Sequence, residues 1–311
     1  MLVLVLVLAY TALVLRCGPR LLANRAWTVA SPRLGLLCWQ AVFAVLVSNT
    51  VLVAAMAVVS VQHLHLDMGH LLHACAVAAW RGLPRADVAV TTAAGLFGML
   101  LFGQLTHVAA GNATAALRLR RQHRDALGLL GAKETQDRVT LLSSDEAFAY
   151  CMPGNGGRIV ISTTAAAELS PEELRAVVAH ERAHLQGRHH LVILLAQVLG
   201  RALPLRSLRL LQPQVATLLE MAADDQACKV TSRDALLSAL LTLAAPGQVR
   251  PGLAVDGGAT VARALRLANP PPPPPCPVRI ARAAAALAVA GAPWLLAGAP
   301  VLLALTGHCD R

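Results

Sequence analysis

The chain has 311 residues, of which 56% are hydrophobic and only 14% charged, and its formal net charge is +10 at pH 7. Soluble domains are normally nearer to roughly one quarter charged, so this composition favours membrane helices. The arginines lie beside the apolar segments without interleaved aromatic residues, which argues against direct binding of nucleic acid. The seven cysteines include no CxxC pair, which argues against a disulfide framework and against a cysteine-ligated zinc site.

Four apolar segments are predicted to cross a membrane, which makes the chain a multi-pass α-helical membrane protein. They lie at about 1–15, 36–61, 89–111 and 283–306. The first segment is at the lower limit of length for a span, and a signal anchor or a cleaved signal is the alternative for it. Residues 1–117 therefore hold three predicted spans, and a short tail, 307–311, follows the fourth.

The distribution of arginines predicts the topology, because loops rich in arginine stay in the cytoplasm. Four arginines follow the first segment, and four stand on each side of the stretch between the third and fourth segments, whereas the loop 63–87 holds two. That stretch is therefore expected to be cytoplasmic and both termini extracytoplasmic. The loop also holds a group of histidines, for which we favour an interfacial amphipathic helix over a second metal site. These are His63, His65, His70 and His73.

The cytoplasmic stretch, 118–268, is long enough for one compact domain of α+β type. We expect an arginine-rich helix, Leu117–Leu130, at its start. Short strands separated by turn residues are predicted at Val139–Leu142, Ala147–Cys151 and Arg158–Ser162. A free edge of the last of these strands would bind an extended peptide by strand addition. A proline-rich linker, 269–282, joins the domain to the fourth span.

The segment HERAH, residues 180–184, carries the candidate chemistry. On a helix, residues four apart lie on one face, so His180 and His184 can direct two imidazoles to one cation. Glu181 is then placed to act as a general base on a water beside that cation. A helix is predicted here because SPEE, residues 170–173, combines an N-cap serine, a proline at the first helical position and a capping-box acid.

A catalytic zinc ion needs three protein ligands and one open position, and two residues compete for the third place. His190 would complete the spacing HExxHxxGxxH of the metzincins. Glu220 precedes Asp224 by four residues on a predicted helix, so Glu220 would bind the metal while Asp224 orients a ligating histidine. We favour Glu220, because the metzincin scheme requires a Met-containing turn and Met221 lies within that same predicted helix instead.

The segments LSPEELRAVVAHERAHLQGRHH and LLEMAADDQA resemble the gluzincin core of BlaR/MecR-type antirepressor membrane metallopeptidases. HtpX-type and CAAX prenyl endopeptidases are more distantly similar and share the HExxH plus ExxxD plan. The resemblance implies an inserted α+β zincin domain in which His180, His184 and Glu220 bind one Zn²⁺ ion. It also implies that Glu181 is the catalytic base and that Asp224 orients a ligating histidine through the ring nitrogen that does not bind the metal.

The resemblance further implies a protein substrate, and we predict a cytoplasmic transcriptional repressor that is cut in signal-regulated proteolysis. Relatives that sense β-lactams carry a penicillin-binding domain after their fourth span, whereas this sequence runs five residues past it and has no SxxK serine. We therefore expect the signal to enter through the loop 63–87, the spans, a separate sensor protein or a homo-oligomer.

Two other functions are kept as alternatives. One is an HtpX-like protease of membrane-protein quality control, and the other is a non-catalytic zinc-binding membrane scaffold. The residue that stabilises the oxyanion is not identified by the sequence, and Tyr150, His189 and His190 are the candidates.

Overall fold

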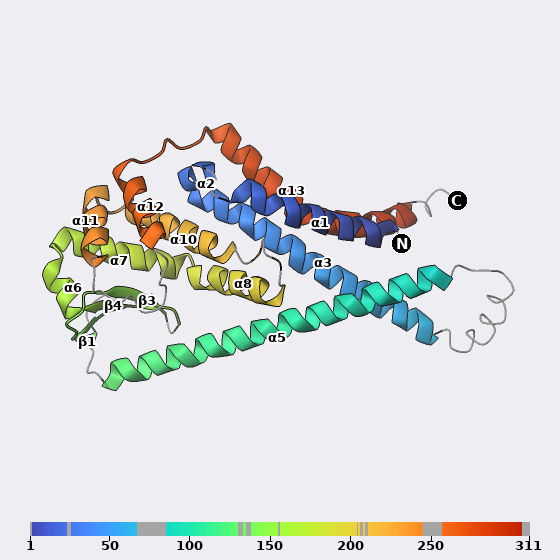
Figure 1. Cartoon of the computed structure of the whole chain (residues 1–311), viewed down its shortest axis with the longest axis horizontal. Helices are drawn as coiled ribbons and strands as arrows, with labels where there is room; N and C mark the ends of the chain where they lie inside the picture. Colours follow the sequence, from blue (N-terminus) through green and yellow to red (C-terminus); the bar gives the residue numbers. More distant parts are fainter. Residues whose placement is uncertain are drawn as a thin grey trace. The chain divides into compact units, whose positions relative to one another are not determined.

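The structure is a computed structural model of the whole chain, and it describes residues 2–23, 26–66, 85–129, 133–134, 138–154, 156–203, 205, 208, 211–244 and 257–306. The chain divides into two compact units, each of which is described by itself (Figure 1). The helical unit comprises Met1–Leu21, Leu37–Val108 and Ile280–Arg311. The sheet unit comprises Leu22–Leu36 and Ala109–Arg279.

The helical unit is built from long apolar helices that exchange a few polar contacts. Its helices belong to α1 (Leu2–Leu22), α3 (Pro32–Leu66), α5 (Arg85–Leu129) and α13 (Cys276–Thr306). The Tyr10 hydroxyl donates to the carbonyl oxygen of Val289 at 2.7 Å, which joins α1 to α13. Asn49 donates from Nδ2 to Oγ1 of Thr11 at 2.5 Å, which joins α3 to α1. Such bonds satisfy polar groups that apolar surroundings would leave unpaired.

Three helices in the described part of the chain are long and apolar enough to cross a membrane, which suggests membrane association. Their apolar stretches are Val5–Leu22, Pro32–Ala54 and Cys276–Leu296, which correspond to the first, second and fourth predicted spans. The third predicted span lies within α5, whose first turns carry side chains outside the described residues, and it stays a prediction. The topology also stays a prediction.

The group of histidines in the loop 63–87 lies largely outside the described residues. The backbone of α3 includes His63 and His65, but their side chains are not described. His70 and His73 are outside the described residues altogether. Their predicted interfacial role is therefore not tested.

Two helices have boundaries that differ from those predicted from the sequence. The arginine-rich helix Leu117–Leu130 is the end of α5, a continuous helix of 45 residues, because no proline interrupts the chain between the third predicted span and Leu129. Residues 270–275 have no regular secondary structure, as a proline run requires, but α13 already begins at Cys276, within the expected linker.

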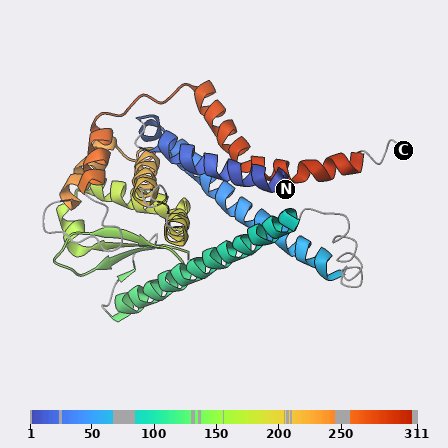
Figure 2. The ribbon, with the colours of Figure 1, turned by 45° about the vertical axis from the view of Figure 1, so that its right-hand side comes forward.

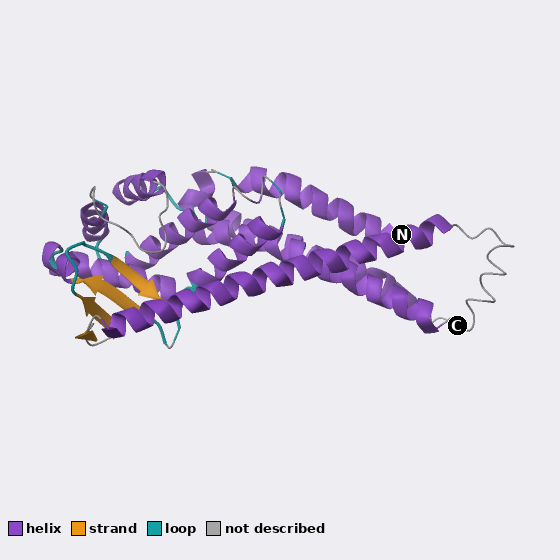
Figure 3. Cartoon of the chain, turned by 60° about the horizontal axis from the view of Figure 1, so that its bottom comes forward, coloured by secondary structure: helices purple, strands orange, loops and turns teal. Residues whose placement is uncertain are grey.

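The sheet unit contains a four-stranded sheet with the strand order β1-β2-β4-β3 (Figure 3). The strands are β1 (Lys133–Glu134), β2 (Val139–Leu142), β3 (Ala149–Met152) and β4 (Arg158–Ser162). β2 and β4 are parallel, and the other pairs are antiparallel. The three strands predicted from the sequence are confirmed, with β3 at Ala149–Met152 rather than Ala147–Cys151.

The prediction of a free edge on β4 is wrong, because β4 lies between β2 and β3. Ile159, Val160 and Ile161 are each at most 2% exposed. An uninterrupted apolar run of this kind is typical of a strand that is covered on both faces. The strand at this edge of the sheet is β3, the one that lies next to the candidate metal ligands.

Different helices cover the two faces of the sheet (Figure 2). Ile159 and Ile161 pack with Val177 of α7 (Pro171–Gln186) and with Leu243 of α11 (Arg233–Leu243). Val160 points to the opposite face, where its cluster includes residues of β2, β3 and α5. Successive side chains of a strand point to opposite faces, so β4 contributes side chains to the packing on both faces of the sheet. The sheet unit also contains α2 (Ala26–Ala30), α6 (Thr163–Glu168), α8 (His189–Ala202), α10 (Leu211–Ala227) and α12 (Gly257–Ala268).

The predicted start of α7 is confirmed. Ser170 accepts from the Glu173 backbone N–H at 3.3 Å, and the Glu173 carboxylate accepts from the Ser170 backbone N–H at 2.7 Å. Pro171 occupies the first helical position. Two of the unpaired N–H groups at the helix start are thereby satisfied, which fixes where the helix begins and which residues share its inner face.

Candidate metal centre

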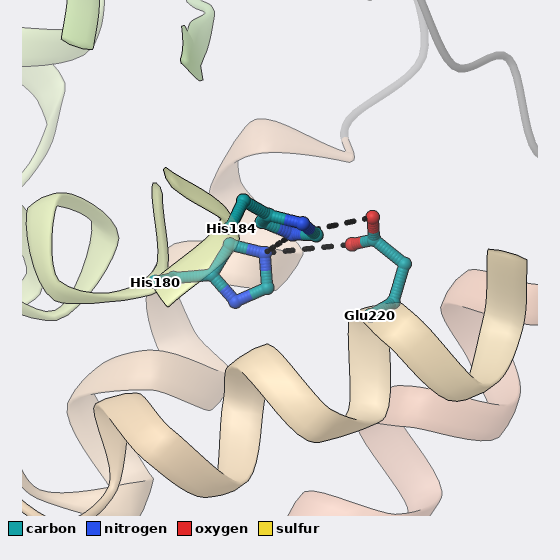
Figure 4. Close-up of side chains that lie close together, drawn as sticks. All are labelled: His180, His184 and Glu220. Atoms are coloured by element: carbon teal, nitrogen blue, oxygen red, sulfur yellow. Dashed lines mark hydrogen bonds and ion pairs between the residues drawn. The ribbon is translucent and has the colours of Figure 1, made fainter. Parts of the chain in front are cut away.

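Helices α7 and α10 pack against each other and bring together three side chains from distant parts of the sequence (Figure 4). His180 and His184 lie one turn apart on α7, and Glu220 comes from α10. The two Nε2 atoms are 3.1 Å apart, and each lies 3.4 Å from a carboxylate oxygen of Glu220. The structure thus assembles the triplet that the sequence suggested as metal ligands.

The donor set of this triplet fits a zinc ion. Both histidines contact another side chain through Nδ1, so their Nε2 atoms are left to face Glu220. A cation between the two imidazole nitrogens and the carboxylate would bind all three groups. One ligand atom from each of the three residues lies within 4.8 Å of the other two, which is compatible with binding of one metal ion.

Asp224 and Arg263 support the ligands from the side away from the metal position. Oδ1 of Asp224 lies 2.9 Å from Nδ1 of His180, the arrangement that we predicted for this aspartate. Arg263 of α12 donates to the two Asp224 oxygens at 2.9 and 2.7 Å and to Glu220 at 2.8 Å. The arginine thereby offsets part of the negative charge of the two buried carboxylates and fixes their orientation.

The electrostatics of the cluster favour positive charge at the metal position. Burial alone would raise the pKa of Asp224, but Arg263 and His180 outweigh it and lower this pKa to about 2. Burial opposes protonation of His180, but its contacts with Asp224 and Glu220 prevail and raise its pKa to about 9. Burial lowers the pKa of His184 to about 3, which keeps this imidazole neutral, as a metal ligand must be.

Glu181 lies beside the triplet without belonging to it. Burial raises the pKa of Glu181, although His180 acts in the opposite direction. A carboxylate with a raised pKa is a stronger base than an exposed one, which suits proton transfer near neutral pH. The thiol of Cys151 on β3 is its neighbour, and burial together with Glu181 raises the pKa of Cys151 well above the usual range. Cys151 is not part of the described group of residues that can share a metal ion.

A cavity of about 560 Å³ opens beside the metal ligands within the sheet unit. Its walls include the edge strand β3 with Tyr150 and Cys151, and α8 with Ile193 and Leu194. Arg120 near the end of α5 adds a positive charge to the lining. A concave, mostly apolar site with a few polar groups is the usual form of a substrate site.

His189 and His190, the first two residues of α8, have different surroundings. Among the described residues, the group that can share a metal ion consists of His180, His184 and Glu220, and His190 is not part of it. His190 lines the cavity instead. His189, which the sequence suggested only as an oxyanion candidate, lies with its Nδ1 2.9 Å from Nδ1 of His184.

The contacts of Arg263 were not predicted from the sequence, where Arg263 and Arg266 belong to the four arginines that precede the fourth predicted span. In the structure Arg263 and Arg266 are 5% and 8% exposed, and Arg266 donates to Asp225 at 2.9 Å. Buried ion pairs are not juxtamembrane surface charges, so they do not bear on topology. The signal that was available is the amphipathic pattern of α12, which places Arg263 and Arg266 about one turn apart.

Replacing Arg263 with leucine is expected to destabilise the protein strongly, because Glu220 and Asp224 would keep buried charges without their counter-ion. Breaking a buried ion pair from one side typically costs about 3–5 kcal/mol. Arg266→Leu on the same helix is the matched control, since Asp225 is 32% exposed and stays hydrated. Thermal unfolding of the full-length variants in detergent measures the difference, and equal losses of stability in the two variants would contradict this account.

Residues 113–245 match the model of Peptidase family M48. The matched segment includes the sheet, α7 with its two histidines, and α10 with Glu220. No curated protein and no solved structure matches the chain. The match supports the prediction of a zinc-dependent peptidase. The narrower resemblance to BlaR/MecR-type enzymes stays a prediction. Residues 113–245 are thus similar to the peptidases of family M48, and the group His180, His184 and Glu220 within them is compatible with a metal site.

Proposed function

We propose that the protein is a zinc-dependent endopeptidase with its active centre between α7 and α10. In this proposal His180, His184 and Glu220 bind one zinc ion, Glu181 is the general base, and Asp224 orients His180. The observation that carries it is the convergence of two Nε2 atoms and a carboxylate at 3.1–3.4 Å, next to a buried glutamate. The M48 match supports the same conclusion from the sequence.

A zinc ion held by His180, His184 and Glu220 would supply Lewis acidity to a water molecule and to the scissile carbonyl. Glu181 takes the proton of the attacking water and passes it to the leaving amine. The burial that raises the pKa of Glu181 makes both transfers easier, because the carboxylate accepts a proton readily and the acid formed remains available to donate it. Asp224 and Arg263 keep the ligands in place during these steps.

The substrate would lie along the edge of β3 as an additional strand. β3 is at the edge of the sheet, and Tyr150 and Cys151 on it line the cavity beside Glu181. Backbone hydrogen bonds to an edge strand hold a peptide in extended form regardless of its sequence, while the cavity wall selects side chains. Tyr150 and His190 also line the cavity and are our candidates for stabilising the oxyanion.

We place the protein in the cell membrane as a multi-pass protein, with the peptidase domain in the cytoplasm. A transcriptional repressor is our proposed substrate, on the basis of the sequence resemblance. The apolar cavity wall, with Ile193, Leu194 and Leu240, also suits the apolar segments of damaged membrane proteins, which favours quality control as the second candidate. In either case a sensor protein or a second copy of the chain would regulate the enzyme.

Removal of the metal tests this proposal. Full-length protein purified in detergent is expected to cleave an unfolded protein such as casein, to lose this activity with 1,10-phenanthroline, and to regain it with added Zn²⁺. Metal analysis of the same samples should show about one zinc ion per chain in the active protein. Cleavage that persists in metal-free protein would contradict the proposal, and zinc binding without any cleavage would favour the scaffold alternative.

A further inference from the structure

The end of α7 forms a sharp turn that directs the chain back towards the metal ligands. Gly187 is the C-cap of α7, and Arg188 adopts a left-handed conformation with φ 49° and ψ 38° before α8 begins at His189. This turn places the His189 ring edge-on against His184, with ring centroids 4.7 Å apart and an interplanar angle of 87°. Both histidines are buried, with 9% of each exposed.

The contact between the two rings is a hydrogen bond between like atoms, since Nδ1 of His189 lies 2.9 Å from Nδ1 of His184. A neutral imidazole has a proton on one nitrogen and a lone pair on the other, so one of the two Nδ1 atoms donates and the other accepts. A neutral His184 that offers the Nε2 lone pair to a cation carries its proton on Nδ1. His184 is then the donor and His189 the acceptor.

We propose that His189 is a positioning residue for the metal ligand His184. By accepting the Nδ1 proton, it fixes the tautomer of His184 and the rotation of its ring, so that Nε2 faces Glu220. The inference rests on the proposed zinc site and deepens it. Asp224 has the equivalent place at the other histidine, with Oδ1 2.9 Å from Nδ1 of His180. The two histidine ligands thus have different partners, a carboxylate behind His180 and an imidazole behind His184.

Gly187 supports this role by an independent observation. A Cβ atom on Gly187 would lie 2.4 Å from Nε2 and 2.5 Å from Cδ2 of His189, closer than real Cβ contacts. The backbone of Gly187 has φ −74° and ψ −5°, which any residue can adopt. The close approach of the His189 ring is therefore the main reason for a glycine at this position. An alanine there would displace His189 without altering its chemistry.

The experiment measures the zinc affinity of the full-length protein in detergent by competition with a chromophoric chelator. His189→Leu removes the acceptor, and Gly187→Ala displaces it, so both variants are expected to bind zinc about 10–100-fold more weakly. His189→Asn places a carbonyl oxygen where Nδ1 stood and should restore affinity close to that of the wild type. His190→Leu, on the next residue of the same helix, should leave zinc affinity unchanged.

The visible spectrum of the Co²⁺-substituted protein gives a second readout, because it responds to the geometry of the ligands and not to stability. His189→Leu should alter this spectrum, and His189→Asn should restore it. Unchanged zinc affinity in His189→Leu, or equal losses in the leucine and asparagine variants, would overturn the inference while leaving the zinc site intact. A wild-type protein that binds no zinc would overturn the proposed function and this inference together.

Discussion

Replacing Glu181 with glutamine is expected to lower the rate of peptide hydrolysis by about two to four orders of magnitude while zinc stays bound. Glutamine has the shape of glutamate but cannot take the proton of the attacking water. Glu181 lies next to the metal ligands without being one of them, so the ligand set is preserved. The measurement is the cleavage rate of a fluorogenic peptide, together with the zinc content of the same sample.

The matched control is Glu172→Gln in the first turn of the same helix, where the glutamate side chain is 72% exposed. This variant removes the same charge from α7 and should cleave at the wild-type rate. An undiminished rate in Glu181→Gln would contradict the assignment of the base. Loss of zinc from Glu181→Gln would contradict the proposal that Glu181 is the base and not a metal ligand.

Replacing Glu220 with alanine is expected to remove most of the bound zinc and with it the activity. Two histidines alone leave a zinc ion with half of its tetrahedral set, and the substitution also leaves Arg263 with a single carboxylate partner. Glu220→Gln is the milder variant, since it keeps the side-chain volume and weakens only the ligand charge. Metal analysis after gel filtration measures the zinc content.

The control for the ligand assignment is His190→Ala, which changes the residue of the metzincin alternative. It should retain zinc, because His190 lines the cavity rather than joining the triplet in the described structure. The opposite result, with zinc lost from the His190 variant and retained by both Glu220 variants, would contradict the gluzincin arrangement.

Local features of the fold could be predicted from the sequence, while the order of the strands could not. The capping box at Ser170 depends on contacts within three residues, and apolar runs bounded by turn residues predicted the bounds of β2 and β4 correctly. The central position of β4 depends on pairing with β2 and β3, which no short pattern encodes. The apolar run Ile159–Ile161 was nevertheless a usable signal, because a strand covered on both faces has no alternation.

The same distinction between local patterns and tertiary contacts applies to the candidate metal centre. The group of His180, His184 and Glu220 could be proposed from the sequence because a helical spacing of four residues, as in His180/His184 and in Glu220/Asp224, indicates a shared face. Arg263 is 39 residues from Asp224 in sequence, and its contact depends on how α12 packs. His189 reaches His184 only because Arg188 adopts a left-handed conformation, which an arginine rarely does and which its identity does not predict. Residues that support a ligand through tertiary contacts are therefore the part that needed the structure.

The most direct measurement of the central claim is a comparison of protein N-termini between cells that produce the wild type and cells that produce Glu181→Gln at equal levels. An endopeptidase with Glu181 as its base predicts new N-termini that appear with the wild type and are absent with the variant. A repressor substrate would give one or two such termini, and quality control would give many from membrane proteins. Identical sets of N-termini in the two strains, under conditions where the purified wild type binds zinc, would contradict the account.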